Sequence, residues 1–376
     1  TLSSSSAASD VYKRQVMDKP GFNFSVGPTF LVPRVQEELL KATTNCEGSG
    51  YSLYELGHRS QLFGNIVEEL TARVRHLLDV PPEFDILFCP GGGSMQFSAV
   101  PLNLCTQGCR GGYIITGLWS LLAYREADRI SRAYVLWNGD DKKLPSDKLV
   151  ATKGTDFVLY CDNETVDGKE FQTSPNVDLG DAVLVADMSS NILTRQIDWS
   201  RHACVFAALQ KNMGTAGATM VIVRRELYGS ISAKIPELLS WKAYAQTDSI
   251  PNTPPVVAIY TALLVSRWVQ EEGGVEVMAE RAQKRSCTVY SALDSMSGFY
   301  LDLQPPAIRS RINIVFRLET EALEQLFLAE AIQAGLYNLN GHSTRGGMRA
   351  SLYNAMPQEG ADALAKFLTE FYQRHG

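Results

Sequence analysis

Residues 182–211 read AVLVADMSSNILTRQIDWSRHACVFAALQK and contain two short apolar runs, each followed by a charged residue. The runs are continuous rather than alternating, which is typical of strands that are covered on both faces. Similar runs alternate with stretches of helical periodicity along the chain, around residues 86–88, 113–116, 133–136, 157–160 and 219–223. The sequence therefore predicts an α/β fold, with a large domain built on a mainly parallel, seven-stranded type of sheet covered by helices.

The pattern changes after Pro255. Two long helices, two short strands and a last helix that opens at Pro357 are predicted there. We expect these elements to form a smaller α+β domain. The predicted division is a large α/β domain of residues 32–272 and a small domain of residues 17–31 and 273–376.

Composition argues against several classes of protein. The chain has 376 residues, with 35 Lys and Arg against 41 Asp and Glu, so its net charge is −6. An acidic chain lacks the basic face of a duplex-binding protein, and no apolar run approaches the roughly 18 residues of a membrane span. We expect no nucleic-acid partner and no membrane insertion.

The cysteines and histidines indicate the redox compartment and argue against a metal site. Seven cysteines without a C-x-x-C pair predict buried free thiols in a reducing compartment, and five histidines without an H-x-x-x-H pair predict no metal site. We expect a cytoplasmic protein. Organelle targeting stays open, because residues 1–16 are rich in Ser and Ala and lack an initiating Met. That stretch is expected to be a disordered, non-native leader.

Ligands of open α/β sheets bind beyond the carboxyl ends of the strands, and unusual residues follow three of the apolar runs. They are the turn Pro90-Gly-Gly-Gly-Ser94, Asp187 and Lys211. Taken singly, each fits a simpler structure: a turn, a strand-end charge, or an Asp–Lys ion pair. Together they suit a cofactor with a phosphate, a protonated ring nitrogen and a carbonyl, which pyridoxal phosphate combines. Trp119 could stack on such a ring or belong to the core.

The chain also resembles the class V aminotransferases, within fold-type I of the pyridoxal-phosphate enzymes, and among them the phosphoserine aminotransferase family. The resemblance extends from about Phe22 to Gly376. Its segments are Asn23-Phe-Ser-Val-Gly-Pro28, Gly57-His-Arg-Ser60, Gly91-Gly-Gly-Ser-Met-Gln-Phe97, Thr116-Gly-Leu-Trp119, Asp162-Asn-Glu-Thr165, Ala186-Asp-Met-Ser-Ser-Asn-Ile-Leu193, Gln210-Lys-Asn-Met-Gly-Thr-Ala-Gly217, Asn252-Thr-Pro-Pro255 and Gly346-Gly-Met-Arg-Ala-Ser-Leu-Tyr-Asn-Ala-Met-Pro357.

The resemblance implies roles for residues around the cofactor. Lys211 would bind its aldehyde, Asp187 would hold its pyridine nitrogen and Trp119 would stack on its ring. A homodimer with shared active sites would be required, because two cofactor-binding residues come from the neighbouring subunit. The further cofactor-binding residues would be Gly93, Ser94, Thr165 and Gln210, with Asn252 and Thr253 supplied by the neighbour.

The resemblance also implies how anionic substrates are held. Arg349 would bind the substrate α-carboxylate, while His58 and Arg59 of the partner and His342 would face the distal anionic group. One position departs from the family, which commonly has Gly-His-Arg where this chain has Gly341-His-Ser343. Either Arg345 replaces the arginine expected at that position, or one contact to the substrate phosphate is missing.

The expected activity is a ping-pong amino transfer between L-glutamate and 3-phosphohydroxypyruvate, giving 2-oxoglutarate and O-phospho-L-serine for L-serine biosynthesis. An alanine–glyoxylate type of class V aminotransferase is the nearest alternative, and a non-catalytic binding protein on this fold is another. A nicotinamide oxidoreductase fits the α/β pattern but not the motif, because Gln96 stands where G-x-G-x-x-G requires its last glycine.

Overall fold

The computed structural model describes residues 21–105, 110–139, 142–230 and 235–376. The leader expected at residues 1–16 lies outside the described residues, as does the 17–20 part of the predicted small domain.

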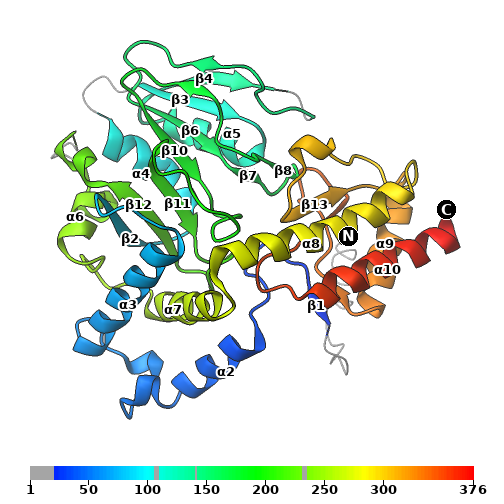
Figure 1. Cartoon of the computed structure of the whole chain (residues 1–376), viewed down its shortest axis with the longest axis horizontal. Helices are drawn as coiled ribbons and strands as arrows, with labels where there is room; N and C mark the ends of the chain where they lie inside the picture. Colours follow the sequence, from blue (N-terminus) through cyan, green and yellow to red (C-terminus); the bar gives the residue numbers. More distant parts are fainter. Residues whose placement is uncertain (1–20, 106–109, 140–141, 231–234) are drawn as a thin grey trace, which may run out of the picture.

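A seven-stranded sheet forms the centre of the larger part of the molecule (Figure 1). Neighbouring strands are parallel except that β12 runs antiparallel to both β11 and β2. The expectation of a mainly parallel, seven-stranded sheet is thus confirmed. In spatial order the strands are β2 (Phe84–Pro90), β12 (Ala218–Arg224), β11 (His202–Ala208), β10 (Val183–Asp187), β6 (Phe157–Cys161), β3 (Arg110–Ile115) and β4 (Arg132–Asn138).

Both faces of this sheet are buried, which explains the continuous apolar runs. In β11, Val205 and Ala207 belong to one hydrophobic cluster and Cys204 and Phe206 to another, because successive side chains point to opposite faces. Helices α3 (Gln61–Leu77) and α7 (Val256–Glu271) contribute to the first cluster. The second cluster includes side chains of α4 (Ser94–Leu104), α5 (Leu118–Ala127) and α6 (Trp241–Gln246).

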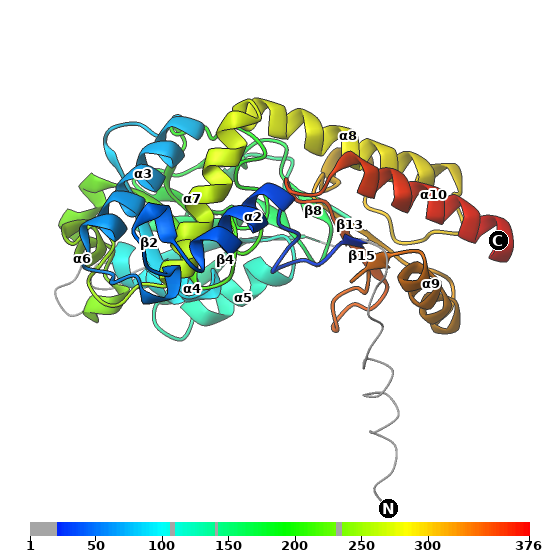
Figure 2. The same cartoon turned by 90° about the horizontal axis from the view of Figure 1, so that it is seen from below.

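Residues after 273 build a second unit together with the first described strand. Phe24 packs in a separate hydrophobic cluster with residues of the C-terminal segment. Helix α8 links the two units, since Val275 and Met278 pack in the core of the larger one and Val289 and Leu293 in that of the smaller. Figure 2 shows α8 beside α10, away from the large sheet. The smaller unit contains β1 (Phe22–Asn23), β13 (Asn313–Phe316), β14 (Leu336–Tyr337), β15 (Met348–Ser351), α8 (Gly274–Ser295), α9 (Glu321–Gln333) and α10 (Gln358–His375).

The boundaries at residues 31/32 and 272/273 stay a prediction, since Leu31 and Val275 both pack with the core of the larger unit. The remaining short elements connect or flank the two units. They are α2 (Pro33–Ala42), β5 (Leu149–Val150), β7 (Asn163–Glu164), β8 (Lys169–Glu170), β9 (Val177–Asp178) and the 3-10 turns η1 (Cys46–Gly48), η2 (Leu53–Glu55), η3 (Arg225–Ser230), η4 (Glu237–Leu239) and η5 (Pro306–Ile308).

Cysteines follow the expectation with one correction. Cys46, Cys89, Cys161 and Cys204 are free and buried, and Cys287 is free and exposed. The expectation of free thiols is wrong for Cys105, which is disulfide-bonded. This residue is half-buried and caps the end of α4, outside the buried strands that hold most of the free thiols.

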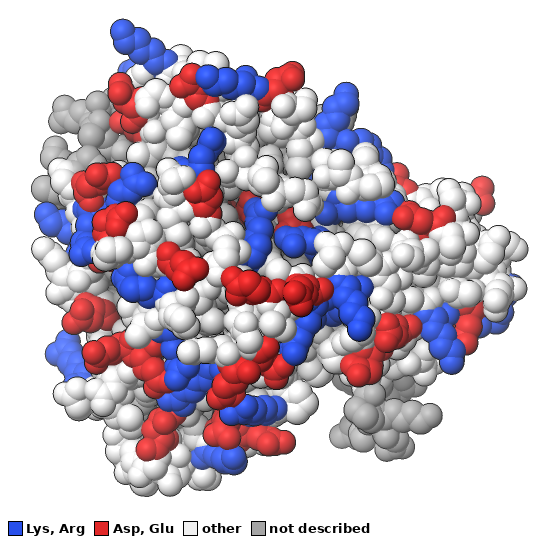
Figure 3. Space-filling view, viewed as in Figure 1, with Lys and Arg blue, Asp and Glu red and all other residues white. Residues whose placement is uncertain are grey.

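Surface charge and hydropathy add two observations. Lys and Arg are interspersed with Asp and Glu over the face seen in Figure 3, so this face carries no extended patch of one sign. Within the described ranges, no helix is long and apolar enough to cross a membrane.

The same part of the chain holds no cluster of His, Cys, Asp and Glu suited to a metal ion.

Candidate active site

Six of the seven strands, all but β12, have their carboxyl ends at the same edge of the large sheet. Strands β2, β3, β6, β10 and β11 point the same way, so the residues that follow them are brought together although they are far apart in sequence. The predicted cofactor residues that follow these strands are Gly93, Ser94, Trp119, Thr165, Asp187, Gln210 and Lys211.

Lys211 lies in the turn after β11, held on both sides by hydrogen bonds. The Thr29 hydroxyl donates to its backbone carbonyl at 2.9 Å, and the next residue, Asn212, donates its side-chain amide to the Ile192 carbonyl at 2.9 Å. The Lys211 Nζ atom lies 5.6 Å from the centre of the Trp119 ring. Burial lowers the pKa of Lys211, and the negative charge of Asp187 opposes this shift.

Asp187 ends β10 as a buried carboxylate. Its Oδ1 accepts a hydrogen bond from the Ser189 backbone N–H at 2.9 Å, whereas Oδ2 faces the Cys161 thiol at 3.9 Å. Burial raises the pKa of Asp187, and the positive charge of Lys211 opposes the shift. A buried carboxylate with one oxygen bonded to so weak a donor suits a further cationic N–H partner.

Trp119 belongs to the first turn of α5 and is held there by two carboxylates. Its indole Nε1 donates to the Thr165 hydroxyl at 2.8 Å, and its backbone N–H donates to Glu164 Oε2 at 2.9 Å. Ser120 donates to Glu164 Oε1 from both its backbone, at 2.8 Å, and its hydroxyl, at 2.6 Å. The Leu118 N–H donates to Asp167 Oδ2 at 2.9 Å. This geometry fixes the plane of the indole beside Lys211.

Sequence reasoning assigned no role to Glu164 or Asp167. Glu164 lies in the segment Asp162-Asn-Glu-Thr165, but no neighbouring residue indicates that its side chain binds the start of a helix 45 residues earlier in the chain. Burial, and next the negative charge of Asp167, raise the pKa of Glu164 to about 7, while its hydrogen bonds with Ser120 and Trp119 act in the other direction. Two adjacent buried carboxylates are therefore part of the site.

The glycine turn approaches the ends of β10 and β11 closely. Gly91 has a φ of +97°, which favours glycine, and its N–H donates to the Gly217 carbonyl at 2.8 Å. Gly93 is the N-cap of α4, and a Cβ on it would lie 3.0 Å from Ser189 Oγ. Helix α4 begins at Ser94, directly after this turn, so its N-terminal amides lie at the sheet edge.

Arg349 comes from β15 of the smaller unit and is 8% exposed. Its Nη1 donates to the Thr165 backbone carbonyl at a long 3.4 Å, and among the described residues it forms no ion pair. Burial lowers the pKa of its guanidinium. The side chain predicted to bind a carboxylate is therefore a buried cation that no described carboxylate neutralises.

The nearby loop places its two candidate residues differently. Arg345 pairs with Asp167 through an Nη1–Oδ1 distance of 2.7 Å, and so lies against the start of α5. The Nδ1 atom of His342, a half-buried residue, lies 2.7 Å from the Thr344 hydroxyl, within its own loop.

The other four predicted residues form no hydrogen bond or ion pair with Lys211 among the described residues. His58 and Arg59 occupy the turn before α3, and in the part of the chain that is described neither side chain forms a hydrogen bond or an ion pair. Thr253 is exposed, and the buried Oδ1 of Asn252 has no hydrogen-bond partner. Their role in a neighbouring subunit stays a prediction.

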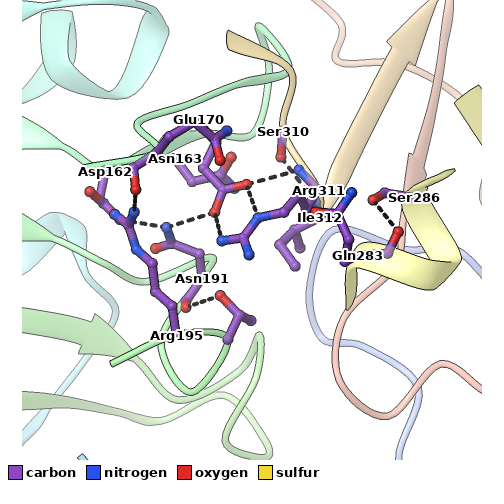
Figure 4. A network of polar contacts seen from close by, with 12 residues as sticks. Asp162, Asn163, Glu170, Asn191, Arg195, Gln283, Ser286, Ser310, Arg311 and Ile312 are labelled. Carbon is purple, nitrogen blue, oxygen red and sulfur yellow. Dashed lines mark hydrogen bonds and ion pairs between the residues drawn. The ribbon is translucent and has the colours of Figure 1, made fainter. Parts of the chain in front are cut away.

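A buried polar network supports the segment that carries Thr165 (Figure 4). Asp162 accepts hydrogen bonds from Asn191 Nδ2 at 2.5 Å and from Arg195 Nη2. Glu170 pairs with Arg311 of the smaller unit at 2.8 Å. These contacts join the end of β6 to the smaller unit, and none of these ion pairs was predicted from sequence.

Comparison with known proteins agrees with this geometry. The family model described as aminotransferase class-V matches residues 21–364. A curated phosphoserine aminotransferase of Geobacillus kaustophilus is 40% identical over 360 residues, covering 95% of this chain and 99% of that protein. One from Bacillus cereus is 38% identical over 354 residues, covering 93% and 98%.

Solved structures give the same result. The phosphoserine aminotransferase from Bacillus circulans subsp. alkalophilus superposes with a TM-score of 0.90 at 34% identity, covering 95% of this chain and 99% of that one. A pyridoxal-phosphate-bound phosphoserine aminotransferase from Trichomonas vaginalis has a TM-score of 0.88 at 34% identity, covering 93% and 99%. The chain belongs to the class-V aminotransferase family.

Proposed function

We propose that this protein is a pyridoxal-phosphate-dependent phosphoserine transaminase. It would transfer an amino group from L-glutamate to 3-phosphohydroxypyruvate, giving 2-oxoglutarate and O-phospho-L-serine for L-serine biosynthesis. The observation that carries the proposal is the placement of Lys211 and Asp187 at neighbouring strand ends, with the Trp119 ring 5.6 Å from Lys211 Nζ. The similarity to phosphoserine aminotransferases over most of the chain supports it.

The residues present fit pyridoxal phosphate. When bound, this cofactor supplies an aldehyde that reacts with amines and a ring that accepts negative charge from the neighbouring carbon. Asp187 Oδ2, which faces only a weak thiol donor, would accept the ring N–H. Lys211 would bind the aldehyde and Trp119 would stack on the ring. The phosphate and ring hydroxyl would be held by Gly93, Ser94, Gln210 and Thr165, with Asn252 and Thr253 of a second copy.

Lys211 also suits the proton transfer that amino transfer requires. Burial lowers its pKa, so a larger fraction of the amine is neutral near pH 7 than for an exposed lysine. A neutral Nζ can accept a proton from the substrate α-carbon and later return it. Its fixed backbone position limits the side chain to a small region beside Trp119.

A homodimer completes the proposed site. Among the described residues, the side chains of His58 and Arg59 form no hydrogen bond or ion pair within their own chain, and the buried Asn252 Oδ1 lacks a hydrogen-bond partner. In a twofold dimer these residues would reach the neighbouring site, and they would add positive charge for a distal phosphate. We also propose a cytoplasmic location. Five free cysteines among the described residues support it, whereas the disulfide at Cys105 counts against it.

Arg349→Gln is expected to raise the KM for both L-glutamate and phosphoserine by about 10- to 100-fold, because each would lose a charged hydrogen bond to its α-carboxylate. The melting temperature should stay the same or rise, since the change removes a buried cation without an ion-pair partner. Steady-state kinetics and thermal unfolding check both parts. A lower melting temperature with unchanged KM values would assign Arg349 a structural role.

Single-turnover spectroscopy tests the substrate. Phosphoserine is expected to deplete the visible absorbance of the cofactor-loaded protein at concentrations where L-alanine does not. Inorganic phosphate should compete with phosphoserine, and Arg59→Ala should weaken that competition by about tenfold, because it removes one charged contact. Arg129→Ala, at an exposed arginine paired with Glu126, is the control.

Equal depletion by L-alanine and phosphoserine would favour the alanine–glyoxylate alternative. A protein that takes up no pyridoxal phosphate would instead favour the non-catalytic one.

A further inference from the structure

We propose that Arg345 is a positioning residue for Trp119. Through its ion pair with Asp167 it ties the 341–347 loop of the smaller unit to the first turn of α5, which carries the indole. We call the set formed by Arg345, Asp167, Glu164 and the backbone amides of residues 118–120 the α5 clasp. The inference rests on the proposed function for the role of Trp119, but not for the contacts themselves.

The start of α5 is enclosed by its two carboxylates. A Cβ on Gly117 would lie 2.3 Å from Asp167 Oδ2 and 2.7 Å from Glu164 Cδ, so only glycine fits there without a shift. Three successive amides, at residues 118–120, donate to these two side chains. Carboxylates at a helix N-terminus satisfy free N–H groups and interact favourably with the helix dipole.

The acidic pair needs positive charge nearby. Glu164 and Asp167 are 1% and 6% exposed, and the negative charge of Asp167 helps to raise the pKa of Glu164. Arg345 supplies a cation at 2.7 Å from Asp167 Oδ1, on the oxygen that does not accept from Leu118. The same carboxylate therefore binds the helix through one oxygen and Arg345 through the other.

The same short segment also connects to the substrate side of the site. Thr165 accepts a hydrogen bond from the Trp119 indole at its hydroxyl and from Arg349 at its carbonyl. Gln304 of the smaller unit donates to the Asp167 carbonyl at 2.8 Å. Arg345 and Arg349, four residues apart, therefore both bind the 165–167 segment that holds Trp119.

Apolar packing does not fill the space between the loop and the helix. A cavity of about 270 Å³ is lined by Gly117, Leu118, Asp167 and Arg345. Polar contacts therefore contribute much of the connection at this place, and removal of the ion pair should loosen the first turn of α5 rather than the whole fold. Arg345 thus has a role in the site that needs no contact with substrate.

The test uses Arg345→Gln, Asp167→Asn and the double variant, with Arg345→Lys as the conservative change. Arg317→Gln, which removes a half-exposed ion pair with Glu324 beside the same loop, is the matched control. Amide hydrogen exchange of residues 118–120 is measured in the cofactor-free protein. We expect each single variant to exchange about three- to tenfold faster, as for loss of a partly buried ion pair.

Three further results are expected. The double variant should exchange no faster than the faster single variant, because the two residues act through one contact. Arg345→Lys should retain most of the protection, and Arg317→Gln should match the parent protein. In the loaded enzyme, Arg345→Gln should weaken cofactor binding and lower kcat with L-glutamate as well as with phosphoserine, since Trp119 contacts neither substrate selectively.

Two outcomes would overturn the proposal. One is unchanged exchange in Arg345→Gln together with a raised KM for phosphoserine alone, which would place Arg345 on the substrate phosphate. The other is additive effects of the two single variants. Amide exchange is measured without cofactor or substrate, so it tests the α5 clasp independently of activity. A protein inactive on phosphoserine would contradict the proposed function, but the exchange rates of residues 118–120 would still test the role of Arg345.

Discussion

Lys211→Ala is expected to lower kcat for amino transfer by at least about 10⁴-fold, because the variant loses both the amine that binds the cofactor aldehyde and the proton carrier. Lys211 Nζ lies 5.6 Å from the centre of the Trp119 ring, and alanine leaves no amine at that position. Rapid-mixing kinetics of the half-reaction with phosphoserine measure the loss, and the visible absorbance of the bound cofactor reports the missing covalent link.

The control for this variant is a lysine outside the site. Lys366→Ala removes an exposed lysine paired with Glu370 in α10 and should leave kcat and the visible absorbance unchanged. Lys211→Arg separates charge from chemistry, because arginine keeps a cation but has no amine that loses its proton near neutral pH. Turnover by Lys211→Ala at near-normal rates would disprove the proposed catalytic role.

Asp187→Asn is expected to lower kcat by about 10²- to 10³-fold, the usual cost of removing one electrostatic group from a reacting centre. Asparagine keeps the volume and can still accept from the Ser189 N–H, so the fold should persist. It lacks the negative charge that would keep the cofactor ring nitrogen protonated. Steady-state kcat, together with the dissociation constant for pyridoxal phosphate, measures the effect.

Asp198→Asn is the matched control, because Asp198 is an exposed aspartate in the same β10–β11 connection. Its side chain accepts hydrogen bonds from the backbone and hydroxyl of neighbouring Ser200. It should leave kcat and cofactor affinity unchanged. If Asp187→Asn retained full kcat, the ring nitrogen would have to be held by another residue, and the proposed assignment of Asp187 would be wrong.

Local sequence patterns predicted most of the elements because the physical signal was itself local. The continuous apolar runs became β10 and β11, and the two long helices expected after Pro255 are α7 (Val256–Glu271) and α8 (Gly274–Ser295). Helix α9 (Glu321–Gln333) was not predicted. Few of its residues are buried, among them Phe327 and Ala331, and apolar residues lie around much of its circumference, so the periodic signal is weak.

The chemistry of the strand ends was likewise readable from sequence. A glycine turn, Asp187, Lys211 and Trp119 each follow an apolar run, and parallel strands bring such positions to one edge. Sequence reasoning could not assign Glu164 and Asp167 to the start of α5, because their hydrogen bonds span 45 and 49 residues. It also left the position of Arg345 open between two possibilities.

The sequence by itself determined the class of fold, because a strand buried on both faces is a run of consecutive apolar residues. It also determined which groups are proposed to carry the chemistry, because these follow directly after such runs. Only the tertiary structure decided which groups neutralise one another: Arg345 pairs with Asp167, whereas Arg349 is buried without an ion-pair partner among the described residues. Arg345 lies in the 341–347 loop, and Arg349 lies in β15, which follows directly. Charge pairing depends on distances of a few ångströms between segments far apart in the chain, which no local pattern encodes.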